Sequence, residues 1–226
     1  MIGKLILSIV IAAVIGYLMG SINSAITVVR LLKHEDVRQF GSGNAGLTNT
    51  LRCFGKLCAL FTLIGDLGKG VIAVLLSRDL VAQAIMGSEY DVYFIGYVAG
   101  LTAILGHVFP LYYGFKGGKG VLVGVSIFLV LVWRVFCILI GIFAVILIFS
   151  KYVSLSSIIA TACAPFVTVV SQYIRWDGYD TWRLVMHFLL TAAMAAVIIW
   201  MHRSNIERLK NGTENKFGSK KPKTQS

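Results

Sequence analysis

The sequence predicts an all-α integral membrane protein built as a single domain. Of its 226 residues, 57% are hydrophobic and only 14% are charged, whereas a soluble domain has roughly 45–50% apolar and about 25% charged residues. Uncharged runs recur along the chain, and their length is close to the ~20 helical residues that cross the hydrocarbon core of a bilayer. A soluble protein is therefore excluded. We expect one membrane-embedded domain over residues 1–215 and a basic, disordered tail over 216–226.

Apolar segments give the predicted spans in chain order. The clear spans carry no charged residue, and they are residues 5–29, 92–115, 152–174 and 184–201. Residues 57–77 also have the length of a span, although they contain Asp66 and Lys69. Residues 120–150 are interrupted only by Arg134, so they form either one very long helix or two short helices with a tight turn at Arg134 and the tryptophan before it.

The distribution of positive charge favours seven spans over six. With seven transmembrane helices, 16 Lys and Arg residues gather on one side and 5 on the other, whereas six spans divide them almost equally. Lys and Arg near the ends of spans prefer the cytoplasm. We therefore expect the N-terminus outside, the C-terminus inside, and the glycine-rich loops on the cytoplasmic side.

Three other interpretations of the composition are weaker. The net charge of +11 is typical of a nucleic-acid binder, but much of it lies in short segments between spans and in the tail, so we expect no nucleic-acid partner. The first apolar run is longer than the ~7–15-residue core of a signal peptide and leads into a basic loop. The cysteines follow no zinc or redox spacing, so we expect free thiols at Cys53, Cys58, Cys137 and Cys163 and no bound metal.

The first polar motif is GSGNAGLTN at residues 41–49, with Arg52 just beyond it. It matches the GxGxxG pattern, but a dinucleotide site needs a strand before it, and membrane helices flank this one. Glycines let successive backbone N–H groups point into an anion-binding concavity, and Ser42, Asn44 and Arg52 add donors. The motif predicts a phosphate site, and a flexible glycine turn is the alternative.

The second motif comprises GHVFP at residues 106–110 and FKGGKG at 115–120. Tyr113 stands where a Walker A loop has its first glycine and Gly120 where it has Ser or Thr, which argues against ATP binding. Lys116 and Lys119 on a glycine hinge at a helix start still suit a phosphate. A basic loop that only orients the chain would explain the lysines but not the glycines.

Two further groups lie near the same side of the membrane. Asp66 and Lys69 share one helical face and would each cost ~2.5–3.5 kcal/mol at a helix centre, so we expect them to pair or to face a polar cavity. A purely structural ion pair is an equal alternative. At the end of the last span, His202, Arg203 and Asn205 suit binding, although a snorkelling basic helix end is the ordinary explanation.

Together the motifs resemble the bacterial acyl-phosphate:glycerol-3-phosphate acyltransferase family. GSGNAGLTN, GDLGKG, GHVFPLYYGFKGGKGV, KYVSLSS and HRSNIERLKNGTENKFG follow one another in the order and spacing of that family. The chain departs from the pattern at Asn23, where the family usually has proline, at Leu47, and at Leu122 and Val123. These changes leave the phosphate-type donors in place.

The resemblance implies an enzyme of the bacterial cell membrane that needs no cofactor and works as a monomer. It would transfer an acyl group from acyl phosphate to the sn-1 hydroxyl of glycerol 3-phosphate, giving lysophosphatidic acid, in the first acylation step of phospholipid synthesis. The catalytic positions that it implies are Ser42, Asn44, Arg52, Lys116, His202 and Asn205. The positions that would bind substrate or phosphate are Gly43, Gly46, Lys69, His107, Gly117, Gly118 and Lys119.

The source of the base and a rival function remain open at this stage. None of the four histidines is followed by aspartate five residues on, as a His-x₄-Asp acyltransferase requires, so we expect the departing phosphate to accept the proton. The rival is a small membrane transporter or channel for an organic phosphate, with the lysines as its filter. A transporter predicts polar residues on a path to both faces and often an internal repeat, and neither is evident.

Overall fold

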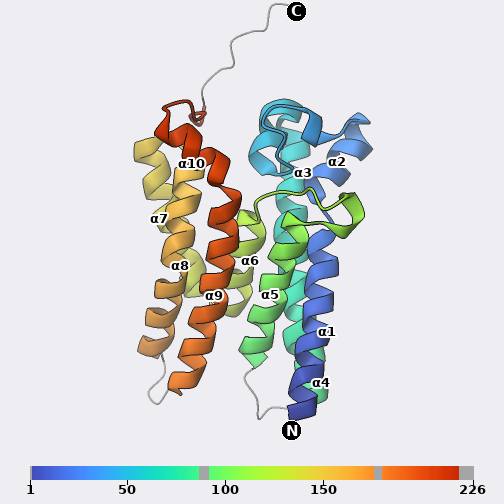
Figure 1. Cartoon of the computed structure of the whole chain (residues 1–226), viewed down its shortest axis with the longest axis vertical. Helices are drawn as coiled ribbons and strands as arrows, with labels where there is room; N and C mark the ends of the chain where they lie inside the picture. Colours follow the sequence, from blue (N-terminus) through green and yellow to red (C-terminus); the bar gives the residue numbers. More distant parts are fainter. Residues whose placement is uncertain (1, 87–91, 176–179, 219–226) are drawn as a thin grey trace, which may run out of the picture.

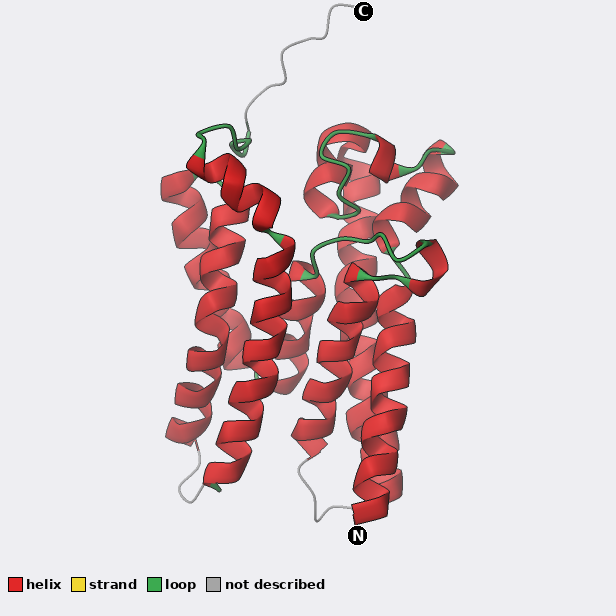
Figure 2. Cartoon of the chain, viewed as in Figure 1, coloured by secondary structure: helices red, strands yellow, loops and turns green. Residues whose placement is uncertain are grey.

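The computed structural model describes residues 2–86, 92–175 and 180–218, and in these ranges the chain is helical with short connecting loops (Figures 1 and 2). The main helices are α1 (Ile2–Ser21), α2 (Ser24–Lys33), α3 (Leu47–Leu75), α5 (Val92–Val108), α6 (Val121–Leu131), α7 (Trp133–Ser150), α8 (Val153–Arg175) and α9 (Thr181–Met201). The shorter elements are η1 (Val37–Gln39), a π-helical stretch η2 (Leu76–Ala82), α4 (Gln83–Met86), η3 (Leu111–Tyr113) and α10 (Arg203–Lys210). The predicted all-α class is confirmed.

The long helices stand side by side in two groups with α6 between them (Figure 1). Helices α1, α3 and α5 form one group and α7, α8 and α9 the other, while α6 packs against both α3 and α7. The described chain begins at one end of the bundle and ends at the other. The loops before α3 and before α6, and α10, lie toward the end of the bundle where the C-terminal segment lies (Figure 2).

Within the described residues, six helical segments are long and apolar enough to cross a membrane. Large apolar side chains cover their outer surface, as at Ile64, Ile148 and Phe149, which are 58%, 70% and 84% exposed. Such a surface suits lipid, so the chain is a multi-pass membrane protein. Helix α6 has 11 residues and is shorter than these spans. The seven-span arrangement and its orientation therefore stay predictions.

The first predicted span, residues 5–29, is broken in two. Helix α1 ends at Ser21, and the Asn23 side chain begins α2 by accepting the Ile26 N–H at 3.1 Å. The Ile22 carbonyl, released from helical bonding at the break, accepts a hydrogen bond from Lys69 Nζ at 2.8 Å. The Asn23 side chain and the Ile22 carbonyl at the break are thus both hydrogen-bonded, as polar groups inside a protein need to be.

The ambiguous segment 120–150 forms two helices. The break falls at Val132, which has φ −147° and ψ 81°, one residue before the predicted turn. The predicted spans 152–174 and 184–201 agree with α8 and α9 to within a few residues. The predicted span 57–77 is part of a longer helix, because α3 already begins at Leu47 and continues through a kink at Gly55.

Two smaller predictions are confirmed inside the bundle. Lys69 Nζ lies 3.0 Å from Asp66 Oδ1, so the two charges in α3 form a buried pair. All four cysteines are free thiols. Of the predicted tail, residues 219–226 lie outside the described residues, while the Phe217 N–H still donates to the Lys151 carbonyl at 2.7 Å. The boundary of the tail stays a prediction.

Candidate active site

A cavity of about 430 Å³ lies between the two groups of helices. Its polar end includes Ser42, Asn44, Arg52, Lys119, His202 and Asn205, together with Arg208 and Glu214. Its other end is an apolar limb between α6, α7, α8 and α9, with Leu122, Val125, Phe143, Ala160 and Ile198 among its lining residues. One cavity therefore offers a charged site and a hydrocarbon-lined site next to each other.

The loop before α3 is held by Asn49. The Asn49 side chain accepts the Ser42 N–H at 3.0 Å and donates to the carbonyls of Phe40 and Val37 at 2.9 and 3.2 Å. The Gly43 N–H donates back to the Phe40 carbonyl at 3.0 Å. The predicted cradle of successive loop N–H groups is therefore wrong in this conformation for Ser42 and Gly43, because these groups are already bonded within the loop.

The starts of two helices, and not the N–H groups of Ser42 and Gly43, offer unpaired N–H groups to the cavity. Leu47 and Thr48 at the start of α3, and Gly120 and Val121 at the start of α6, line the cavity. Among the described residues, no side chain caps either start. Because the first N–H groups of a helix have no partner within it and carry a partial positive charge, both starts suit an anion.

Gly117 and Gly118 of the second motif pack against neighbouring chain and do not line the cavity. The Gly117 and Gly118 N–H groups donate to the carbonyls of Val108 and His107, both at 3.1 Å. A Cβ added at Gly117 would lie 2.0 Å from the His107 carbonyl oxygen, and one at Gly118 would lie 2.2 Å from His107 Nε2 and 2.5 Å from the Ala45 carbonyl oxygen. Only glycine lets this loop pack so closely on α5 and on the first loop.

The same loop separates its two lysines. Lys119 lines the cavity, whereas the exposed Lys116 does not. Arg38 Nη1 donates to the carbonyls of Tyr113 and Lys116 at 2.7 and 3.2 Å, which ties the second loop to the segment before α3. The predicted pair of phosphate-binding lysines is thus reduced to one at the cavity.

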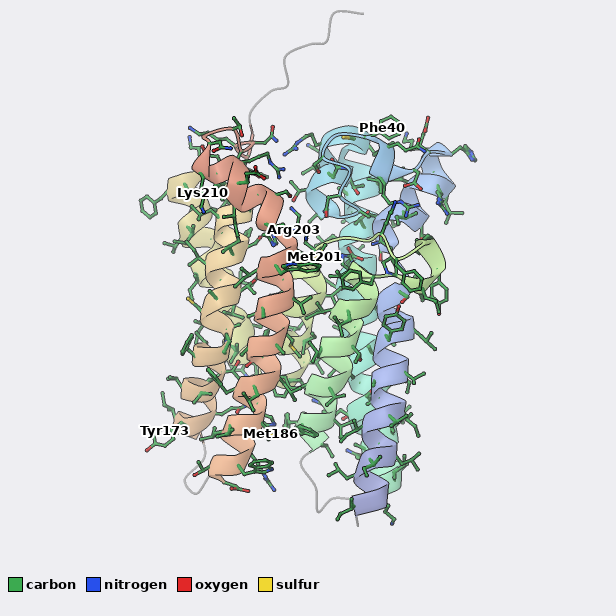
Figure 3. The ribbon with its side chains drawn as sticks, viewed as in Figure 1. Phe40, Tyr173, Met186, Met201, Arg203 and Lys210 are labelled. Carbon is green, nitrogen blue, oxygen red and sulfur yellow. The ribbon has the colours of Figure 1, made fainter. Side chains whose placement is uncertain are left out.

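The C-terminal segment folds over the polar end of the cavity. Lys119 Nζ donates to Asn205 Oδ1. Glu214 accepts from Asn205 Nδ2 at 2.9 Å, from Ser154 Oγ at 3.1 Å and from Arg208 Nε at 2.7 Å. Figure 3 labels Met201, the last residue of α9, and Arg203, the first residue of α10, where the chain turns into this segment. Residues far apart in the sequence thus form one hydrogen-bonded network.

Burial changes the proton affinities of two groups at this end. Burial, aided by the positive charge of Arg208, lowers the pKa of Lys119 to about 8. Burial also lowers the pKa of His202 to about 4, although the bond of Nδ1 to the Ile198 carbonyl at 2.8 Å opposes this change. Burial raises the pKa of Glu214, but hydrogen bonds from Arg208 and Asn205 outweigh it and keep the carboxylate ionised.

Lys69 does not line the cavity and has three partners of its own. Its ammonium lies 2.8 Å from the Ile22 carbonyl, 2.8 Å from His107 Nδ1 and 3.0 Å from Asp66 Oδ1. An ammonium can only donate, so the Ile22 carbonyl and His107 Nδ1 accept hydrogen bonds from Lys69, whereas the contact with Asp66 Oδ1 is an ion pair. With Nδ1 accepting from Lys69, the neutral His107 ring carries its proton on Nε2. His107 and Asp66 both line the cavity, so Lys69 is connected to it through these two partners.

Comparison with known proteins identifies the family. A family model described as glycerol-3-phosphate acyltransferase matches residues 10–212. The chain belongs to the glycerol-3-phosphate acyltransferase family. A family member of that name from Halalkalibacterium halodurans is 42% identical over 210 residues, which cover 92% of this chain and 95% of the relative. Another from Clostridioides difficile is 37% identical over 216 residues, covering 96% and 98%.

Solved structures agree with the family assignment. Crystal structures of PlsY (YgiH), an integral membrane glycerol 3-phosphate acyltransferase, superpose with TM-scores of 0.77 for a glycerol 3-phosphate form and 0.76 for a lysophosphatidic acid form. They are 33% and 31% identical to this chain and cover 93% of it and 96% of their own chains. This acyltransferase is therefore an enzyme, and the transporter alternative loses its support.

The structure of the acyltransferase adds residues that the sequence analysis did not select. Arg208 and Glu214 lie in the last motif and complete the network at the cavity, and Asn49 and Arg38 hold the two loops. Arg208 and Glu214 lie six residues apart on either side of a glycine, so only the folded turn reveals that they meet. Asn49 belonged to the quoted motif, but nothing in the sequence separates a residue that shapes a loop from one that binds a ligand.

Proposed function

We propose that this acyltransferase moves an acyl group from acyl phosphate to the sn-1 hydroxyl of glycerol 3-phosphate. The products are lysophosphatidic acid and phosphate, and the site faces the cytoplasm in the plasma membrane of a bacterium. The glycerol 3-phosphate and lysophosphatidic acid forms of PlsY support the acceptor and the product. The donor is inferred from the motifs and from the chemistry of the cavity.

The observation that carries the proposal is the two-part cavity. Its polar end has two uncapped helix starts and the cations Arg52, Lys119 and Arg208, which together suit two phosphate groups. Its apolar limb suits the hydrocarbon chain of the donor and of the product. A site for two small soluble phosphates would not need that limb.

The candidate residues divide into three roles under this proposal. Ser42, Asn44, Arg52 and Lys119 contact phosphate oxygens at the polar end, and Asn205 orients Lys119. Gly43, Gly46, Gly117 and Gly118 give the two loops their shape, and Lys116 contributes through its main chain. Lys69 orients His107, whose Nε2–H donates to a substrate oxygen. His202 lines the wall beside the reacting atoms.

The reaction needs no base from the protein. The acceptor hydroxyl oxygen attacks the acyl carbon, the bond from that carbon to the phosphate oxygen breaks, and the hydroxyl proton moves to the departing phosphate. With a pKa of about 4, His202 is a weak proton acceptor, whereas a phosphate group takes up its second proton with a pKa of ~6. The departing phosphate is therefore the stronger base, and the protein contributes orientation and charge.

Purified protein in detergent tests the function directly. With glycerol 3-phosphate and a long-chain acyl phosphate, we expect lysophosphatidic acid and inorganic phosphate to form in equal amounts. Lys119→Ala, folded to the same melting temperature, is the matched control and should be strongly impaired. Hydrolysis of the acyl phosphate without any lysophosphatidic acid would contradict the proposal.

His202→Gln separates the two proton acceptors. Glutamine keeps the size and a hydrogen-bonding group but cannot accept a proton at neutral pH. We expect a modest loss of kcat, well below the 10²–10⁴-fold that a general base contributes. A loss of that full size, in a variant that still binds both substrates, would assign the base to His202.

A further inference from the structure

The apolar limb of the cavity ends on four residues from four helices. Phe128 of α6, Leu139 of α7, Ala164 of α8 and Thr191 of α9 are the last lining residues in the direction away from Lys119. Each is at most 5% exposed. The Thr191 hydroxyl donates to the His187 carbonyl at 2.7 Å, so its oxygen is bonded to its own helix. These four residues form the floor of the limb.

A buried polar cluster of Tyr97, Gln172 and His187 lies beneath the floor. Gln172 Nε2 donates to the Tyr97 hydroxyl at 3.3 Å, and His187 Nδ1 lies 3.1 Å from Gln172 Oε1. The Tyr97 ring lies 4.7 Å from the His187 ring and 6.5 Å from the ring of Phe128. Phe128 therefore rests on a cluster that links α5, α8 and α9.

The cluster makes the floor a firm end for a hydrocarbon chain. A chain that pushed past Phe128 would separate buried hydrogen-bonding groups and offer them no partner, which is unfavourable. Side chains in a close-packed interior also cannot move apart without a cost in free energy. The methyl end of a chain thus meets a boundary where polar protein atoms replace apolar ones.

The depth of the limb corresponds to a definite chain length. Along α8, the distance from Ser154, which bonds to Glu214 at the polar end, to Ala164 at the floor is about ten residues or ~15 Å at the helical rise. An extended hydrocarbon advances roughly 1.3 Å per carbon, given a C–C bond of about 1.5 Å. The limb thus accommodates on the order of ten to twelve carbons between the polar end and the floor.

We propose that Phe128 and the polar cluster beneath it set how much of the acyl chain the enzyme holds, and so determine its chain-length preference. This inference rests on the proposed donor. Each methylene that enters the limb leaves water or detergent and contributes to binding, whereas each methylene beyond the floor does not. The value of kcat/KM should therefore depend strongly on chain length for chains that end above the floor, and weakly for longer chains.

Acyl phosphates of graded length test the inference. With saturated chains from eight to eighteen carbons at a fixed detergent concentration, we expect kcat/KM to rise by up to roughly fourfold per methylene and then to level at a break. Phe128→Ala should move the break to longer chains by two to four carbons, and the milder Phe128→Leu by about one. Ala164→Leu should move it to shorter chains.

Phe149→Ala is the matched control, because Phe149 is 84% exposed on the outer surface of α7. It removes the same side chain without touching the limb, so its profile should match the wild type. A break that stays in place in Phe128→Ala, Phe128→Leu and Ala164→Leu, all still active on short chains, would overturn the inference while leaving the proposed function intact. Failure of the wild type to use any acyl phosphate would instead overturn the proposed function.

Discussion

Lys116 and Lys119 lie in one short loop, yet the fold gives them different surroundings. Lys119 is largely buried at the cavity and bonded to Asn205, whereas Lys116 is exposed and contributes its carbonyl to Arg38. Their sequence context is almost the same, so the sequence alone assigned both to phosphate. Arg38 binds the main chain at Lys116 through the Lys116 carbonyl, whereas Lys119 directly precedes Gly120, the N-cap of α6, and lines the cavity.

Alanine substitutions should separate the two lysines. A charge-assisted hydrogen bond contributes ~1.5–3 kcal/mol, so Lys119→Ala should lose roughly tenfold or more in kcat/KM for glycerol 3-phosphate or the donor. Lys116→Ala should lose less than about threefold, because its side chain is exposed and does not line the cavity. Steady-state kinetics of both variants checks this, and equal losses would mean that Lys116 reaches the substrates.

The lowered pKa of Lys119 predicts an alkaline limit to activity. Since its pKa is about 8, rising pH removes its charge, and roughly nine-tenths protonation at pH 7 falls to about one-tenth at pH 9. We expect kcat/KM to fall over this range. Arginine stays charged, so Lys119→Arg should show a flatter profile above pH 7, whatever its absolute rate. A wild-type profile that is flat to pH 9, or an identical decline in the arginine variant, would contradict this assignment.

At the scale of elements, the loop 114–120 depends on close packing. Gly117 and Gly118 lie against the main chain and side chain of His107, and neither has a positive φ. Glycine is required at these two positions by the clash that an added Cβ would make with His107, and not by a positive φ.

Alanine at Gly118 should therefore reduce both stability and activity. The added Cβ would meet His107 Nε2 and the Ala45 carbonyl, so the loop has to move and Lys119 moves with it. We expect an overpacking cost of ~1–3 kcal/mol and a clear loss of kcat/KM. Gly68→Ala in α3 is the control, because a Cβ there meets nothing within 4 Å. Thermal unfolding and kinetics that do not differ between the two variants would contradict the packing account.

How well each element was predicted depends on where its partners lie. Hydropathy located the helices α8 and α9 because a lipid-facing helix is apolar along its own length. The break between α1 and α2 was missed because it is stabilised from outside, by Lys69 on the Ile22 carbonyl. The turn of the C-terminal segment over the cavity was missed likewise, since Glu214 finds its partners in α8 and α10.

At the scale of the whole molecule, the fold gathers the polar residues at one end. The two loops and α10 lie toward that end of the bundle (Figure 2), while Tyr173 and Met186 lie toward the opposite end (Figure 3). The described N-terminus also lies at the opposite end (Figure 1). This arrangement fits the charge bias of 16 to 5 in the sequence and places the candidate site on the side predicted to be cytoplasmic.

Single cysteines should report this orientation. In a background with the four native cysteines replaced by alanine, we expect Arg183→Cys to be labelled from outside intact cells by an impermeant thiol reagent. Glu35→Cys and Asn215→Cys, both exposed at the other end, should be labelled only after the membrane is opened. Labelling of either one in intact cells would reverse the predicted orientation.

The choice of acyl donor tests the central claim most directly. In the proposed mechanism, catalysis depends on two anion sites and on a departing phosphate that accepts the proton. A donor without phosphate therefore lacks both the group that binds one anion site and the base. With purified protein, glycerol 3-phosphate and donors of one chain length, we predict rapid formation of lysophosphatidic acid from acyl phosphate and at least a hundredfold lower kcat with the acyl thioester, in keeping with the lower range of general-base effects. Comparable kcat values for the two donors would contradict the account.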